Sequence, residues 1–116
     1  MEISITGKHV DVPQDLKAHM EERLLRLDDK YKLKIVEAHV VLKQEKYIYV
    51  AELKVHVKGA DLFAEETGDE NFFEAFDKVF HVMETQLQRR KEKIKGHHGR
   101  QKVTKIADAL VEEENE

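Results

Sequence analysis

Residues 35–58, IVEAHVVLKQEKYIYVAELKVHVK, contain the pattern that decides the fold. Apolar side chains occupy every second position in two successive runs of this stretch. The first run comprises Val36, Ala38, Val40 and Leu42, and the second comprises Tyr47, Tyr49, Ala51, Leu53, Val55 and Val57. A period of two predicts two β-strands that each bury one face, and Gln44–Lys46 is short enough to join them as a hairpin.

The residues before this hairpin are predicted to form a strand and a helix. Ile3 and Ile5 alternate with polar residues over Glu2–Thr6, a short strand that Gly7 ends. A helix then begins near Pro13. Its apolar side chains recur every three or four residues, at Leu16, Met20, Leu24, Leu27 and Tyr31.

The residues after the hairpin are predicted to form one more strand and a long helix. A turn at Gly59–Asp61 leads into a strand over Leu62–Thr67. Asp69 is a candidate N-cap for a helix from about Glu70 to Lys95. At 1.5 Å per residue this helix is about 39 Å long, so its basic end is expected to overhang the domain. Its apolar stripe comprises Phe72, Phe76, Val79, Met83, Leu87 and Ile94.

The predicted elements follow the order β-α-β-β-β-α. Both helices must bury their apolar stripes, and one face of a four-stranded sheet is the only large apolar surface available to them. The sequence therefore predicts an α+β fold, a two-layer sandwich of a four-stranded sheet with two helices on one face. We expect residues 1–95 to form this domain and residues 96–116 to form a flexible tail, basic and then acidic.

Length and composition indicate the class of protein. The 116 residues carry 20 Lys and Arg against 24 Asp and Glu, and they suffice for a single core. The absence of cysteine excludes disulfides and thiolate chemistry. No run approaches 18 apolar residues, and Met1 leads directly into a predicted strand, so we expect neither a membrane span nor a signal peptide. A soluble cytoplasmic protein is expected.

The net charge of −4 conceals a strongly basic segment. From Arg89 to Lys105 eight basic residues accompany one acid, Glu92, whereas Ile106–Glu116 contains five acids and no base. The dipole of a helix accounts for one or two cations in its last turn but not for a local net charge of +7. This segment predicts binding to a polyanion.

Catalytic patterns are absent from the sequence. The seven histidines show neither H-x-x-x-H nor H-E-x-x-H spacing, and Ser4, the only serine, lies in a predicted strand. No glycine-rich phosphate-binding motif occurs. We therefore expect a binding protein that uses no metal or cofactor, rather than an enzyme.

Four stretches carry a resemblance to a known family. They are I-x-I-T-G-K-H-V at Ile3–Val10, V-V-L-K at Val40–Lys43, D-E-N-F-F-E-A-F-D at Asp69–Asp77 and Q-L-x-x-x-K-x-K at Gln86–Lys93. Together with the order of elements, they make the chain resemble the ribosome hibernation promoting factor family over about residues 1–95. That family includes ribosome-associated inhibitor A and was formerly called sigma-54 modulation proteins.

The resemblance implies both a fold and a function. The fold would be similar in topology to double-stranded RNA-binding domains. The protein would bind the small ribosomal subunit and its 16S-type rRNA on the intact ribosome, over the tRNA and mRNA sites. It would keep idle ribosomes inactive during stress or in stationary phase. The basic and then acidic tail is similar to the inhibitor branch of the family, and we expect a monomer off the ribosome.

The candidate rRNA-binding residues lie on the two predicted helices. Phosphates attract cations regardless of base sequence, and two adjacent helices can present basic residues along one groove. The candidates are Arg23, Arg26, Lys30, Lys78, Arg89, Arg90, Lys91 and Lys93. Lys78 is included because Val82 and Thr85 stand where relatives often carry Lys or Arg. The sheet face away from the helices, which is expected to carry Lys43, Lys54, His56 and Lys58, is a less favoured surface for RNA, and replacing Lys54 and Lys58 by alanine is expected to leave binding unchanged.

Two alternative functions remain open from the sequence. The chain could be an RNA-binding module that acts outside the ribosome, because a basic helix end attracts any RNA. It could also be a protein-interaction regulator with an acidic partner. Co-sedimentation with small subunits separates the first alternative from ribosome binding, and survival of the complex after nuclease treatment identifies the second.

Overall fold

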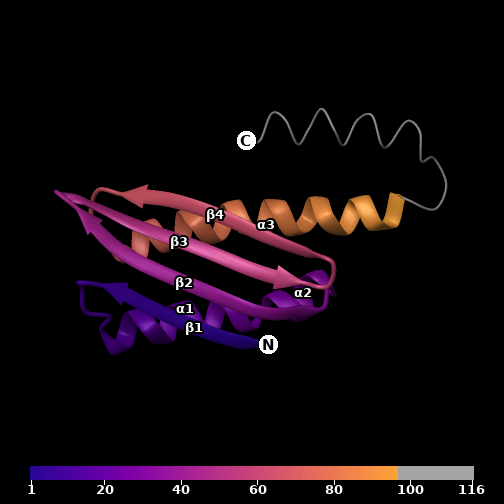
Figure 1. Cartoon of the computed structure of the whole chain (residues 1–116), viewed down its shortest axis with the longest axis horizontal. Coiled ribbons are helices and arrows are strands. Elements are labelled where there is room, and N and C mark those ends of the chain that lie inside the picture. Colours follow the sequence, from indigo (N-terminus) through magenta and orange to yellow (C-terminus); the bar gives the residue numbers. More distant parts are fainter. Residues whose placement is uncertain (97–116) are drawn as a thin grey trace.

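The computed structural model describes residues 1–96 of the chain, and Figure 1 shows their arrangement. The elements are β1 (Glu2–Lys8), α1 (Gln14–Leu25), α2 (Leu27–Tyr31), β2 (Ile35–Glu45), β3 (Ile48–Val57), β4 (Ala60–Gly68) and α3 (Phe72–Gly96). Apart from a break in the first helix, this is the predicted order, and the α+β class is confirmed. The predicted tail falls almost wholly on residues 97–116, outside the described residues, and stays a prediction.

The four strands form one sheet in the order β1-β2-β3-β4. β1 runs parallel to β2, and the other neighbouring strands are antiparallel. A parallel pair needs a crossover connection, which α1 and α2 supply. One row of the register joins Ile5, Val40, Leu53 and Ala64 across all four strands. Side chains in one row share a face of the sheet, and this row belongs to the core.

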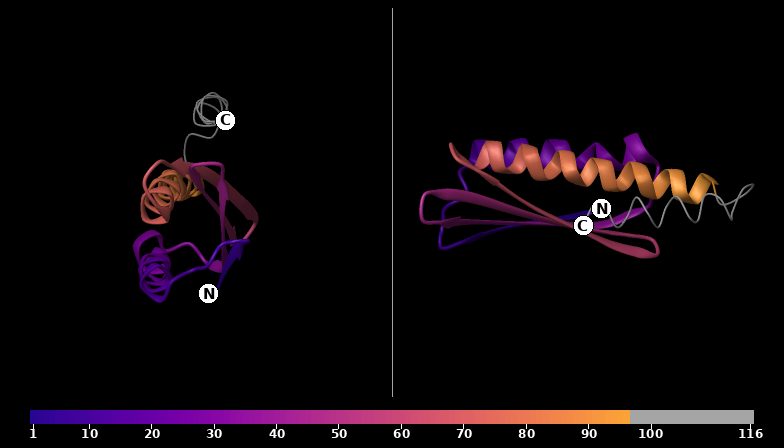
Figure 2. Two further views of the ribbon diagram at one scale, coloured as in Figure 1. Left: turned by 90° about the vertical axis from the view of Figure 1, so that its left-hand side faces the viewer. Right: turned by 90° about the horizontal axis from the view of Figure 1, so that it is seen from above.

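The helices lie side by side on the same face of the sheet, as the end-on view in Figure 2 shows. The predicted apolar stripe of the first helical segment is buried from Leu16 to Tyr31. In α3 the stripe is buried from Phe76 to Leu87, whereas Ile94 is 47% exposed. Each fully buried large apolar side chain contributes about 1.5–3 kcal/mol, so these two stripes hold the layers together.

Ile94 is exposed because α3 continues past the end of the sheet. Figure 1 shows the last turns of α3 extending beyond the strands, as the predicted length of the helix requires. No helix within residues 1–96 is both long enough and apolar enough to cross a membrane.

The first helix is interrupted at Arg26, which the sequence does not predict. The backbone N–H of Arg26 donates to the carbonyl of Arg23 at 3.3 Å, so the chain tightens here to an i−3 bond. A second short helix then ends at Lys32, which adopts the left-handed conformation at φ 57°. Tyr31, just before this end, is buried and packs in the core, so it offers no face for a nucleic-acid base.

The predicted β2–β3 hairpin is confirmed, but its turn is displaced. The strands continue to Glu45 and Ile48, so the turn consists of Lys46 and Tyr47 and not of Gln44–Lys46. Tyr47 is consequently 88% exposed instead of lying on the buried face. Alternation alone does not locate the end of a strand, because a turn residue can continue the pattern by chance.

Two further boundaries differ from the prediction. Val36 is exposed, because the pairing of β2 with β3 shifts register between Ile35 and Glu37 and leaves Ile35 in the core. α3 is capped by Asn71 rather than Asp69, since the Asn71 side chain accepts the backbone N–H of Glu74 at 2.9 Å.

Candidate nucleic-acid interface

Three of the predicted RNA-binding residues border the seam between α3 and the first helical segment, α1 and α2, which lies beside it. Arg23 of α1 and Lys30 of α2 reach across to carboxylates of α3. Lys91 lies seven residues after Glu84, the α3 partner of Lys30. Residues seven apart lie on nearly the same side of a helix, so Lys91 faces this seam as well.

The other residues of the α3 basic run face different directions. Gln86 donates a hydrogen bond to the carbonyl of Phe63 in β4, at 2.9 Å. Arg89 and Lys93 follow Gln86 by three and seven residues and therefore lie on the same flank, toward β4. The basic residues that were predicted to line one groove therefore lie on two different sides of α3.

Arg90 points toward the sheet and contacts the turn between β3 and β4. Its Nη2 donates a long hydrogen bond of 3.5 Å to the carbonyl of Lys58, and its buried Nε has no partner within the described residues. Gly59 leaves room for this contact, because Nη2 lies only 3.1 Å from the position that a Cβ would occupy in any other residue. Gly59 also adopts φ 89°, a conformation that favours glycine. Arg90 therefore has a structural role, because it links α3 to the turn between β3 and β4.

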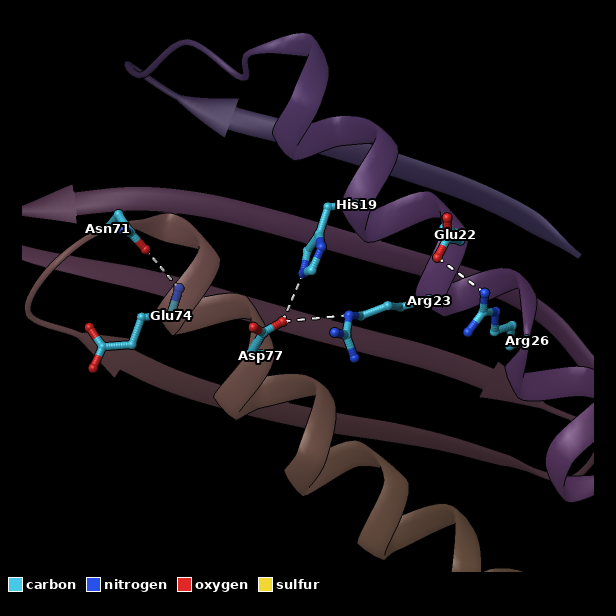
Figure 3. Close-up of polar contacts among 7 residues, drawn as sticks. All are labelled: His19, Glu22, Arg23, Arg26, Asn71, Glu74 and Asp77. Atoms are coloured by element: carbon cyan, nitrogen blue, oxygen red, sulfur yellow. Dashed lines mark hydrogen bonds and ion pairs between the residues drawn. The ribbon is translucent and has the colours of Figure 1, made fainter.

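Arg23 and Arg26, two predicted RNA-binding residues of the first helical segment, are each paired with a carboxylate, as Figure 3 shows. Nε of Arg23 lies 3.7 Å from Oδ1 of Asp77. Nη2 of Arg26 lies 3.2 Å from Oε1 of Glu22, within the same helical segment. Because these carboxylates stand beside the cations, a phosphate approaching them meets a reduced positive charge.

Lys30 and Lys78 are paired in the same way. Nζ of Lys30 lies 2.8 Å from Oε2 of Glu84, and Nζ of Lys78 lies 3.6 Å from Oε2 of Glu74. The hydrogen bond to Glu84 raises the pKa of Lys30 above its ordinary value. Arg89 and Lys91, in contrast, have no ion pair within residues 1–96.

His19 is a residue of the seam that the sequence reasoning missed. Its Nε2 lies 2.9 Å from Oδ1 of Asp77, and its ring packs edge-on against Phe73 and Phe76. Figure 3 shows His19 and Arg23 converging on Asp77 from α1. The only signal in the sequence was that His19 immediately precedes Met20 of the apolar stripe, which places it at the edge of the buried face.

Three further exposed lysines, Lys32, Lys34 and Lys58, lie at the end of the domain where α2 and the β3–β4 turn meet. The run Lys30-x-Lys32-x-Lys34 was visible in the sequence but was not singled out. Lys58, predicted on the outer face of the sheet, lies instead in the turn after β3. Its backbone N–H donates to the carbonyl of Lys34 at 3.1 Å, so these residues belong to one end of the domain.

The outer face of the sheet has a different character. A shallow hollow of about 580 Å³ is lined there by Glu37, His39, Val41, Glu52, Lys54, His56, Asp61 and Phe63. Three carboxylates against one lysine make this hollow unfavourable for a polyanion. The part of the chain that the structure describes contains no group of three or more side chains suited to hold a metal ion.

The fold and the placement of charge define a two-layer α+β domain with exposed cations gathered at one end. The sequence matches the family described as Sigma 54 modulation protein / S30EA ribosomal protein over residues 3–95. The chain belongs to this family, and the resemblance found in the sequence is confirmed.

Two curated relatives are similar over most of the chain. The Ribosome hibernation promoting factor of Salmonella typhimurium is 29% identical over 97 residues, which are 84% of this chain and 100% of that protein. The protein of the same name from Pseudomonas putida is 30% identical over 93 residues, which are 80% of this chain and 89% of that protein.

Two solved structures share the fold. A ribosomal subunit interface protein from Coxiella burnetii aligns with a TM-score of 0.72 and 26% identity, covering 79% of this chain and 99% of that chain. The N-terminal domain of Protein Y from Thermus thermophilus aligns with a TM-score of 0.68 and 27% identity, covering 77% and 98% respectively.

Proposed function

We propose that this chain is a ribosome hibernation factor of the cytoplasm. It binds the small ribosomal subunit through 16S-type rRNA, covers the tRNA and mRNA sites, and keeps idle ribosomes inactive during stress or in stationary phase. Membership of the family and the names of its relatives support ribosome binding.

The observation that carries the proposal is that α3 carries cations without carboxylate partners among the described residues, whereas carboxylates line the hollow on the opposite face of the sheet. Partly exposed cations without carboxylate partners within residues 1–96, such as Arg89 and Lys91, lie on α3. Carboxylates line the hollow on the opposite sheet face. A phosphate backbone is therefore attracted to the helical side of the domain and repelled from the sheet.

The proposed mechanism is occupancy alone. A folded RNA offers phosphates and shape rather than readable base edges, so cations on a rigid helix suffice for binding. A domain seated over the tRNA and mRNA sites then competes with both ligands. No bond needs to form or break for translation to stop.

The test adds purified protein to a reconstituted translation system and measures peptide synthesis together with co-sedimentation on small subunits. We expect inhibition that weakens when the ribosomes already carry tRNA and message. The charge-reversed variant Arg89→Glu/Lys91→Glu should inhibit less. The matched control Lys17→Glu/Lys54→Glu carries the same change of charge away from α3 and should inhibit like the unmodified protein.

Three results would contradict the proposal. Equal inhibition of engaged and idle ribosomes would exclude competition with tRNA and mRNA. A protein that stays off the small subunit yet binds other RNA would instead be an RNA-binding module acting elsewhere. A complex that survives nuclease treatment and contains no ribosomal subunit would point to a regulator that binds another protein.

A further inference from the structure

Three segments of the chain meet at the end of the domain where α3 overhangs the sheet. They are the connection after α2, the turn between β3 and β4, and the last turns of α3. The backbone N–H of Lys58 donates to the carbonyl of Lys34, and the carbonyl of Lys58 accepts from Nη2 of Arg90. Lys58 therefore links all three segments, which Figure 1 shows together at one end of the sheet.

We propose that Lys32, Lys34 and Lys58 form a phosphate-binding surface that takes the sugar-phosphate backbone of RNA. This end surface extends the interface beyond the helices, and the inference rests on the proposed function because the RNA is that of the small subunit. Lys32 and Lys34 were not among the residues predicted from the sequence, and Lys58 was predicted not to bind.

The first argument is the difference in charge compensation. Arg23, Arg26, Lys30 and Lys78 each stand within 4 Å of a carboxylate. A phosphate that approaches such a pair is repelled by the carboxylate while it is attracted by the cation. The ammonium groups of Lys32, Lys34 and Lys58 have no carboxylate within 4 Å among the described residues, and the carboxylate of Asp28 at this connection instead accepts the backbone N–H of Ile35 at 3.2 Å.

The second argument is the charge that Arg90 adds behind this surface. Its guanidinium donates to a neutral carbonyl and not to a carboxylate, and its Nε is buried without a partner within residues 1–96. Arginine stays protonated in proteins, so its charge remains uncompensated at this place. It raises the positive potential at the turn that carries Lys58, while its own Nη2 is engaged by the carbonyl of Lys58.

The third argument is the fixed backbone of the end surface. Lys32 ends α2, and its N–H donates to the carbonyl of Asp28 at 3.0 Å. Lys34 and Lys58 are joined to each other by a backbone hydrogen bond of 3.1 Å. Ordering a loop on binding costs free energy, and a surface whose backbone is already held avoids most of that cost.

The exposed groups at this end indicate which part of the RNA is bound. Lysine is a point charge and recognises phosphate without reading the base. Tyr31, the aromatic residue beside the end surface, is buried and cannot stack on a base. The ligand class is therefore the RNA backbone, independent of sequence.

The experiment compares two triple variants with the same change of charge. Lys32→Glu/Lys34→Glu/Lys58→Glu reverses the end surface. Lys17→Glu/Lys46→Glu/Lys54→Glu reverses three other exposed lysines, and each triple contains one lysine with positive φ, Lys32 or Lys46. Circular dichroism checks the fold, and the milder Lys32→Gln/Lys34→Gln/Lys58→Gln variant is measured as well.

The readout is pelleting with purified small subunits, and filter binding to their deproteinised rRNA, over a series of salt concentrations. Each lost phosphate contact flattens the slope of log K against log salt by about 0.7–0.9, so losing three contacts flattens it by about 2–3. We expect this flattening, with affinity reduced at least about tenfold near 0.1 M salt, in the end-surface variants and not in the control.

The possible outcomes separate this inference from the proposed function. If all variants keep the slope of the unmodified protein on small subunits, the inference is wrong and the proposed function stands. If the unmodified protein does not bind small subunits, both are wrong. If the end-surface variants lose binding to subunits but not to naked rRNA, the lysines contact an acidic protein, which also overturns the inference.

Discussion

Nε2 of His19 in α1 lies 2.9 Å from Oδ1 of Asp77 in α3, and this contact joins the two helices on the face away from the sheet. Asp77 simultaneously stands 3.7 Å from Nε of Arg23. One carboxylate therefore both connects the helices and compensates a predicted RNA-binding cation. The seam between the helices is for this reason a structural contact as well as a candidate binding surface.

Asp77→Asn should raise the affinity for rRNA and slightly lower the stability. The substitution keeps the shape of the side chain but removes the charge that compensates Arg23, so we expect a rise in affinity of about twofold to fivefold at 0.1 M salt. The partly exposed ion pair is worth about 0.2–1 kcal/mol in the free energy of unfolding. Filter binding and urea unfolding measure the two effects.

Asp61→Asn is the matched control for this variant. Asp61 also contacts a histidine, His56, but on the outer sheet face. The control should leave rRNA affinity unchanged. An affinity that does not rise in Asp77→Asn would show that Arg23 lies outside the RNA-binding surface.

Arg90→Ala and Arg89→Ala should differ in their effect on stability. Arg90→Ala removes the hydrogen bond to the β3–β4 turn and the packing of the side chain against it, so the free energy of unfolding should fall by about 1 kcal/mol. Arg89→Ala removes no contact recorded within residues 1–96 and should stay within about 0.5 kcal/mol, while it weakens binding to rRNA. Denaturant unfolding and filter binding of both variants test this, and an equal loss of stability would refute the structural role of Arg90.

Glu74 makes the stability of the domain depend on acid pH. Its Oε1 accepts the backbone N–H of Glu70 at 2.9 Å, and this bond lowers the pKa of Glu74 below its ordinary value of 4.5. The unfolded chain therefore takes up this proton at a higher pH than the folded domain. The stabilisation from Glu74 is present above about pH 4.5 and is lost as the pH falls through the lower pKa of the folded state.

Glu74→Gln should remove this part of the acid dependence. Glutamine can still accept the N–H of Glu70 but does not titrate. We expect the melting temperature of the variant to lie below that of the unmodified protein at pH 7, with the difference shrinking as the pH falls to 3. Glu65→Gln, an exposed residue of β4, controls for the general loss of negative charge. A difference that stays constant over this range would contradict the assignment.

The sequence by itself determined the layers of the domain. The alternation in β3 placed Leu53 and Val55 in the core, and the spacing in α3 did the same for Phe76 and Leu87. Periodicity is a local property of a strand or helix, so it reports which face is buried before any partner is known. It did not locate Val36 or Tyr47, because a register shift and a tight turn interrupt the period without changing the residue types.

Tertiary structure alone decided which cations are available to a ligand. Lys30 and Glu84 are 54 residues apart in the sequence, and only the packing of α2 beside α3 brings them within 2.8 Å. The inward turn of Arg90 likewise depends on the β3–β4 turn lying beneath α3. The spacing of residues on one helix indicates the flank on which a charge lies. The partner that compensates the charge comes from another element, and its position depends on how the helices pack beside one another on the sheet.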